Sequence, residues 1–113
     1  MTPISHIHDL YGFHQEDLDD LRQRLEAVLD LSMEGCDSLY FGGLYYAAIG
    51  GMGSTFRLQF NFGELGDEWA EGEFQEYAVL LYVSCGSEQE SDAVEHTVAH
   101  PSLGARLLRR KIR

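Results

Sequence analysis

The chain has 113 residues, of which 19 are acidic and 8 are basic, so its formal net charge is −11. A chain of this length is expected to fold as one domain, residues 1–113, with a core that needs neither disulfides nor metal. The excess of carboxylates repels phosphate groups, which argues against nucleic acid and anionic membranes as partners and favours a basic partner.

The sequence shows no sign of export or membrane insertion. Its longest apolar run, residues 77–83, is far shorter than the roughly 20 residues that a membrane span needs. The N-terminus lacks the basic-then-apolar pattern of a signal peptide. Two cysteines, Cys36 and Cys85, are too few for a disulfide framework and are expected to be buried free thiols. We therefore expect a cytoplasmic protein.

The C-terminal residues 101–113 reverse the charge of the rest of the chain. They contain no acidic side chain and five basic ones, which are Arg106, Arg109, Arg110, Lys111 and Arg113. We expect this end to lie along acidic neighbours of its own domain, where it relieves self-repulsion. A short RNA-binding tail is the alternative.

The first predicted elements are a strand and a helix. Residues 4–11 alternate loosely and are expected to form an edge strand that Gly12 ends. From Gln15 the period changes, and apolar residues at helical spacing predict an amphipathic helix. These residues are Leu18, Leu21, Leu25, Val28 and Leu29.

A region rich in strand-forming residues follows. Residues 39–46 favour β structure around the glycines at 42–43, which predicts a hairpin or a bulged strand. A glycine-rich turn at 50–53 leads into residues 55–62, whose strict alternation predicts a strand with one apolar face toward the helix. That face carries Phe56, Leu58, Phe60 and Phe62. Residues 77–84 are apolar on both faces and are therefore placed in the middle of the sheet.

The last two predicted elements are a helix and a strand. Ser87 and Glu90 have the spacing of a capping box, which predicts a helix that starts near Ser87 and ends before Pro101. Residues 103–112 alternate imperfectly and are expected to form a strand. Together the elements predict an α+β fold, a mostly antiparallel sheet with two helices packed on one face.

No motif in the sequence indicates catalysis or a cofactor. His6 with His8, and His96 with His100, are pairs without a third ligand, so no metal site is expected. The cysteines lack the local signatures of activated thiols. The turn at 50–53 precedes a strand and has no lysine, unlike a phosphate-binding loop. We expect a protein that is not an enzyme and has no cofactor.

Residues 63–76 are a long connection with many acidic side chains and no basic one. Such loops in compact domains commonly have a function. This one also holds Trp69, the only tryptophan, and Phe74. A calcium-binding loop and a solvated loop without a function are alternatives, although the EF-hand spacing is absent. We favour a surface on which carboxylates steer a basic partner toward an aromatic anchor. Its candidate residues are Glu64, Asp67, Glu68, Trp69, Glu71, Glu73 and Glu76, with Asp17 and Asp20 from the first helix.

Several short motifs together resemble a known group of proteins. The motifs are Asp37-Ser38-Leu39-Tyr40, Gly42-Gly43, Tyr45-Tyr46, Phe56-Arg57-Leu58-Gln59 with Asn61, Leu80-Leu81-Tyr82-Val83 and Leu107-Leu108-Arg109-Arg110. With the acidic stretch between them, they resemble small bacterial immunity proteins of polymorphic toxin systems, of the contact-dependent growth inhibition or Rhs type. The resemblance runs over most of the chain from Leu10 onward. It implies a cytoplasmic, non-enzymatic protein that blocks a cognate toxin domain, often a nuclease with a basic cleft.

Two other classes of function stay open. Tyr40, Tyr45 and Tyr46 would line the pocket of a small enzyme or ligand-binding domain if they came together. The acidic surface would also suit an adaptor for a basic protein. An enzyme needs converging titratable groups in a cleft, whereas binding needs only exposed charge and an anchor, so we put the immunity hypothesis first.

Overall fold

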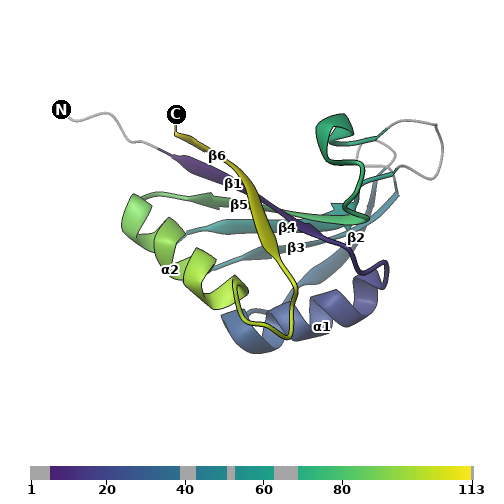
Figure 1. The fold of residues 1–113 in the computed structure, drawn as a ribbon. Coiled ribbons are helices and arrows are strands. Elements are labelled where there is room, and N and C mark those ends of the chain that lie inside the picture. Colours follow the sequence, from purple (N-terminus) through teal and green to yellow (C-terminus); the bar gives the residue numbers. More distant parts are fainter. Residues whose placement is uncertain (1–5, 39–42, 51–52, 63–68, 113) are drawn as a thin grey trace.

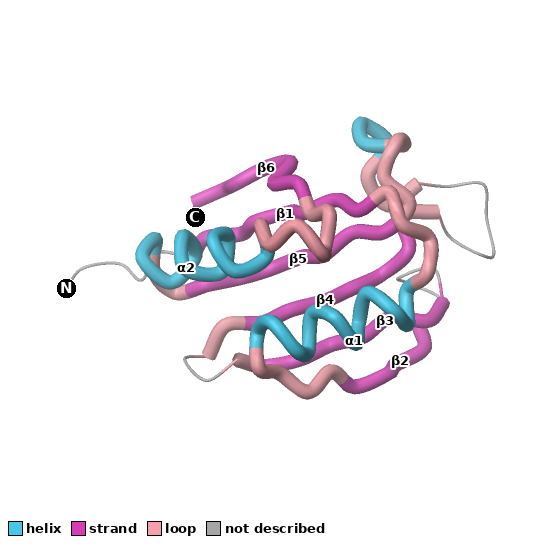
Figure 2. The backbone as a smooth tube through the Cα atoms, turned by 60° about the horizontal axis from the view of Figure 1, so that its bottom comes forward, coloured by secondary structure: helices cyan, strands magenta, loops and turns pink. Residues whose placement is uncertain are grey.

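The computed structural model describes residues 6–38, 43–50, 53–62 and 69–112. They form an α+β fold, as predicted. The strands are β1 (Ile7–Phe13), β2 (Glu34–Ser38), β3 (Gly43–Ile49), β4 (Thr55–Phe60), β5 (Val79–Cys85) and β6 (Arg106–Ile112). They pair antiparallel in the order β2-β3-β4-β5-β1-β6. The helices α1 (Leu18–Leu29) and α2 (Glu88–Val98) cover one face of this sheet, as Figure 1 and Figure 2 show. Neither helix in the described part of the chain is long and apolar enough to cross a membrane.

Helix α1 forms where the leucine spacing predicts it. The Asp17 carboxylate caps its first turn by accepting a hydrogen bond from the backbone N–H of Asp20 at 3.0 Å. Leu18, Leu21 and Leu25 lie on one side of the helix and are buried against the sheet. The amphipathic pattern therefore sets both the position of α1 and the face that it buries.

Helix α2 begins where the Ser87–Glu90 spacing predicts it. The Ser87 hydroxyl accepts a hydrogen bond from the backbone N–H of Glu90 at 3.2 Å. Val94 and Val98 are buried beneath the helix. The helix ends at Val98, before Pro101.

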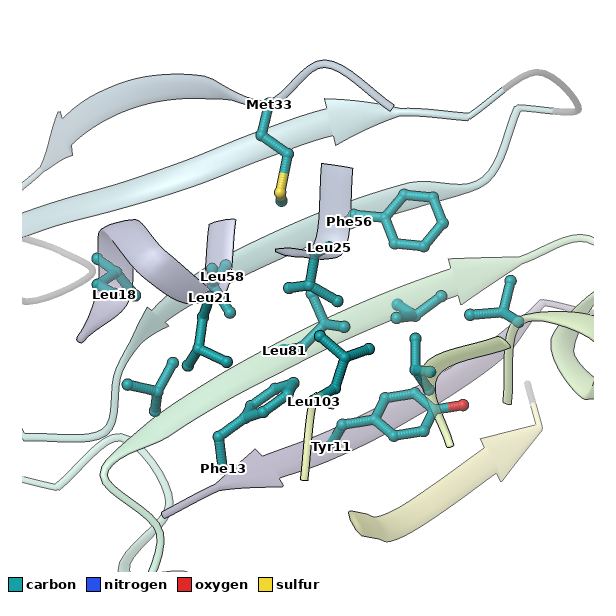
Figure 3. Packing of buried hydrophobic residues seen from close by; sticks show 14 of the residues in the cluster. Tyr11, Phe13, Leu18, Leu21, Leu25, Met33, Phe56, Leu58, Leu81 and Leu103 are labelled. Carbon is teal, nitrogen blue, oxygen red and sulfur yellow. The ribbon is translucent and has the colours of Figure 1, made fainter. Parts of the chain in front are cut away.

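The main core lies between the helices and the sheet. Figure 3 shows Leu21 and Leu25 of α1 packed with Leu58 of β4 and Leu81 of β5, and all four side chains are 0% exposed. Strand β4 thus faces α1 with its apolar row, and β5 lies in the interior of the sheet, as predicted. Burial of such side chains is the principal favourable term in folding a domain of this size.

The apolar row of residues 55–62 does not continue to its predicted end. Phe60 is half-buried and closes β4, whereas Phe62 is 43% exposed and forms an isolated bridge with Trp69. The strand stops there because the side chain and backbone of Asn61 bind the segment that precedes β5. This bend brings Phe62 to the surface.

Strand β1 is not the edge strand that the sequence predicts. It pairs with β5 on one side and with β6 on the other, so the edges of the sheet are β2 and β6. Gly12 does not end it either, because the strand continues to Phe13. A Cβ atom at Gly12 would lie 2.6 Å from Tyr77 and 2.8 Å from Leu108, so glycine lets these two side chains close over the strand.

Strands β2 and β3 pair as a hairpin, but its first strand is residues 34–38 rather than the predicted strand formers around 39–41, and residues 39–42 lie outside the described residues. Tyr45 and Tyr46 are consecutive in β3 and therefore point to opposite faces of the sheet. The Tyr46 hydroxyl donates a hydrogen bond to Asp19 of α1 at 3.2 Å, which places Tyr46 on the helix side. The two tyrosines do not line one pocket, and Tyr40 lies outside the described residues.

The basic C-terminal strand lies along acidic neighbours, as expected. The guanidinium of Arg110 in β6 donates to the Asp9 carboxylate of β1 from Nε at 2.8 Å and from Nη2 at 3.0 Å. It also contacts Asp92 at 2.7 Å and Glu95 at 3.2 Å, both on α2. Hydrogen bonds to Asp9 and then to Asp92 raise the pKa of Arg110 above its ordinary value. One side chain thereby joins β6, β1 and α2.

The two free thiols differ in exposure. Cys85 is buried in β5, whereas Cys36 in β2 is half-buried, in contrast to the predicted burial of both. Burial raises the pKa of Cys85 to about 11, so this thiol stays protonated well above neutral pH. Because the thiolate is the reactive form, we expect Ellman's reagent to modify Cys36 in the folded protein and Cys85 only after unfolding. A Cys36→Ser variant should stay unmodified until denaturant is added, and rapid labelling of that folded variant would contradict the prediction.

Candidate functional site

A hollow of about 570 Å³ opens at the end of the sheet where β4 meets the segment before β5. We call it the aromatic hollow. It is lined by His14, Glu16, Phe60, Phe62, Trp69, Gln75, Glu76 and Ala78. These residues come from four places in the chain, which are the end of β1, the start of α1, the end of β4 and the segment 69–78. The hollow therefore exists only in the folded protein.

Two aromatic side chains on the surface give the hollow its character. Phe62 is 43% exposed and Trp69 is 37% exposed, and their ring centroids lie 5.0 Å apart in an edge-to-face arrangement. Leu44, which is 42% exposed, belongs to the same end of the sheet, because the next residue, Tyr45, pairs with Gln59 of β4. Clustered exposed apolar groups mark binding surfaces more often than scattered ones do.

Asn61 holds the segment that carries Trp69. Its side chain is 0% exposed, and its amide Nδ2 donates to the backbone carbonyls of Phe74 at 2.9 Å and Tyr77 at 3.0 Å. Its Oδ1 accepts a hydrogen bond from the N–H of Glu71 at 2.9 Å. The backbone carbonyl of Asn61 accepts from the N–H of Ala70 at 2.6 Å. Sequence reasoning missed this role, and the only signal was an amide at the end of a strand pattern.

A small apolar cluster supports the same segment from the uncovered face of the sheet. It consists of Leu10, Tyr77 and Leu80, with Phe74 of the short 3-10 helix η2 (Gly72–Phe74) packed against it. His14 stacks on Tyr77 with ring centroids 4.6 Å apart. The segment before β5 is thus held by both hydrogen bonds and packing.

Two carboxylates border the aromatic hollow. Glu16 and Glu76 are exposed, and neither forms an ion pair with another described residue. His14 does not neutralise them, because its Nδ1 donates to the backbone carbonyl of Glu76 at 3.1 Å. The lining of the hollow therefore combines exposed aromatic rings with negative charge.

The structure brings only part of the predicted acidic surface to this hollow. Trp69 and Glu76 line it, and Glu73 is exposed nearby in η2. Glu71 instead accepts a hydrogen bond from Arg109 at 2.6 Å and is committed to an internal ion pair. The remaining predicted loop residues, Glu64, Asp67 and Glu68, lie outside the described residues.

The two carboxylates predicted on α1 have partners within the chain. Asp17 caps the helix. Asp20 accepts hydrogen bonds from Gln15 at 2.6 Å and from Arg24 at 2.7 Å, and these bonds lower its pKa. Glu16, the neighbour of Asp17, is the residue of this region that reaches the hollow.

Two other places on the molecule were considered as sites, namely the histidines as metal ligands and a second hollow on the face of the sheet that the helices leave uncovered. Within the described residues, no group of three or more His, Cys, Asp or Glu side chains is arranged to hold a metal ion. A second hollow of about 510 Å³ lies on the open face, where Ile49, Arg57 and Tyr82 line it among others. It contains none of the predicted partner-binding residues.

Comparison with protein-family models finds no match, and comparison with curated protein sequences finds no significant match.

Proposed function

We propose that this protein is a non-enzymatic immunity protein that binds a basic toxin domain in the cytoplasm and neutralises it. The observation that carries the proposal is the aromatic hollow, which is lined by the exposed pair Phe62 and Trp69 and by Glu16 and Glu76, carboxylates without an ion pair among the described residues. The sequence resemblance to immunity proteins supports the same function.

Charge and aromatic anchors have separate effects in such a complex. A net charge of −11 attracts a basic domain over long range and raises the rate of association. Salt weakens this effect, because the screening length falls to about 8 Å at physiological ionic strength. Affinity depends mainly on a few buried anchors, among which tryptophan is over-represented. The toxin would be blocked when this surface covers its basic cleft.

We expect Trp69→Ala to weaken binding of the cognate toxin domain by about 30-fold or more, since truncation of a central tryptophan commonly costs about 2 kcal/mol. The measurement is titration calorimetry with the candidate toxin domain. Ile49→Ala is the matched control, because Ile49 is 78% exposed and lies in the other hollow. Equal affinities of the two variants would place the interface elsewhere.

The same complex tests the acidic loop. Replacing Asp67, Glu68 and Glu73 by their amides, with Glu71 kept for its bond to Arg109, should slow association and flatten its salt dependence. Wild-type rates at every salt concentration would show that the loop is merely solvated.

A survival assay tests neutralisation itself. Cells that produce the toxin should survive only with the wild-type chain or the control. Tight binding without protection would instead indicate an adaptor for a basic protein.

A further inference from the structure

We infer that the aromatic hollow receives an arginine side chain of the partner. This inference rests on the proposed function and names the group that the hollow recognises.

Arg22 shows the arrangement inside the chain. Its guanidinium carbon lies 5.1 Å from the centre of the Tyr46 ring. The same guanidinium binds the carboxylates of Asp19 and Glu26, each at 2.8 Å. An aromatic face and two carboxylates thus hold one arginine between α1 and β3. The flat guanidinium suits both contacts, since it stacks on rings and donates in the plane.

Arg57 shows the aromatic part of this arrangement on the uncovered face of the sheet. Its guanidinium carbon lies 4.4 Å from the centre of the Tyr82 ring, and its Nε donates to Gln59 at 2.8 Å. Stacking of arginine on an aromatic ring therefore occurs on both sides of this sheet.

The aromatic hollow has the same components without the cation. Phe62 and Trp69 supply exposed rings, and Glu16 and Glu76 supply carboxylates. Among the described residues that line it, none is a lysine or an arginine. Its volume of about 570 Å³ is ample for a long side chain.

The negative charge of Glu16 and Glu76 decides whether an apolar side chain, a lysine or an arginine fits the hollow best. A purely apolar side chain would contact the rings but would leave the exposed carboxylates Glu16 and Glu76 without a cation. A lysine ammonium would satisfy the charge, but it is a compact and strongly hydrated point charge without the flat surface with which a guanidinium stacks on a ring. An arginine satisfies the rings and the carboxylates together.

The test uses the full chain and three capped tripeptides that differ only in the central residue: Gly-Arg-Gly, Gly-Lys-Gly and Gly-norleucine-Gly. NMR titration should move the indole N–H resonance of Trp69 with the arginine peptide and at least about threefold less with the lysine peptide. The norleucine peptide should leave it in place. Equal responses to all three peptides would overturn the inference.

Charge variants locate the contact. Glu16→Gln and Glu76→Gln should each reduce the response to the arginine peptide, whereas Glu88→Gln, which removes an exposed charge at the start of α2, should not. An equal reduction by all three variants would indicate attraction by net charge alone and would overturn the inference.

The peptide titrations and the toxin experiments can fail separately. Toxin neutralisation without an arginine response would refute the arginine site and leave the immunity function standing. An arginine response in a chain that protects against no toxin would leave the site and refute the proposed function.

Discussion

Asp9→Ala is expected to lower the free energy of unfolding by about 3 kcal/mol, because breaking a buried ion pair leaves the other charge without its main partner. The Asp9 side chain is 0% exposed, and it accepts two hydrogen bonds from Arg110 and one from Ser91. Arg110 is 23% exposed and keeps Asp92 and Glu95 as partners, which holds the expected loss near the lower end for such pairs. The measurement is urea unfolding at neutral pH.

Two nearby variants provide the controls. Asp92→Ala removes a carboxylate that is 65% exposed and contacts the same Arg110, so its cost should stay below about 1 kcal/mol. Tyr11→Phe removes a buried hydroxyl that has no hydrogen-bond partner in the described structure, so stability should be unchanged or slightly higher. A loss at Asp9 no larger than the loss at Asp92 would show that burial of this ion pair has no energetic consequence.

Local patterns in the sequence were sufficient for the helices and the central strand. The leucine spacing of α1, the capping box of α2 and the continuous apolar run of β5 each depend on residues close together in the chain. In such elements, propensity and burial favour the same structure.

The position of β1 could not be inferred in this way. Two histidines and Asp9 make the strand look like a solvated edge, but Asp9 is paired with Arg110, 101 residues further along. The covering of Gly12 by Tyr77 and Leu108 likewise depends on distant residues. A charged residue in a strand indicates exposure only when no partner can reach it.

Only part of the candidate site could be predicted from the sequence, because the rest of it depends on contacts between residues that are distant in the chain. Trp69 and Glu76 stand out in the sequence because an aromatic residue among like charges is unusual. The diversion of Glu71 to Arg109 depends on how β6 lies beside β1, and Phe62 is exposed only because β4 ends early. Composition therefore identified the loop, and tertiary contacts selected which of its described residues line the aromatic hollow.

Asn61→Leu is expected to release the segment 70–77 from the sheet, although the substitution changes none of the residues that line the aromatic hollow. Leucine has a similar volume but leaves the N–H of Glu71 and the carbonyls of Phe74 and Tyr77 without this partner. Each unsatisfied buried group costs about 1–3 kcal/mol, and opening the segment to water limits the total. We expect a loss of about 3 kcal/mol in the free energy of unfolding.

Hydrogen exchange separates this local release from general destabilisation. The N–H groups of Ala70 and Glu71, which both bind Asn61 in the wild type, should exchange faster in Asn61→Leu at a urea concentration where Val94 in α2 keeps its protection. Gln75→Ala, in the same segment, should change neither rate. Uniform acceleration across the chain would contradict a clamp confined to this segment.

Release of the segment should also weaken toxin binding, although Asn61 does not line the hollow. Trp69 precedes Ala70, whose N–H is bound to the Asn61 carbonyl, so the ring position of Trp69 depends on a docked segment. An anchor that must be ordered during binding contributes less affinity than one already in place. Asn61→Leu should therefore bind the toxin domain more weakly than the control Ile49→Ala, which lies in the other hollow. A variant with a released segment and wild-type affinity would show that the toxin docks without the aromatic hollow, since the order of Trp69 would then have no bearing on the complex.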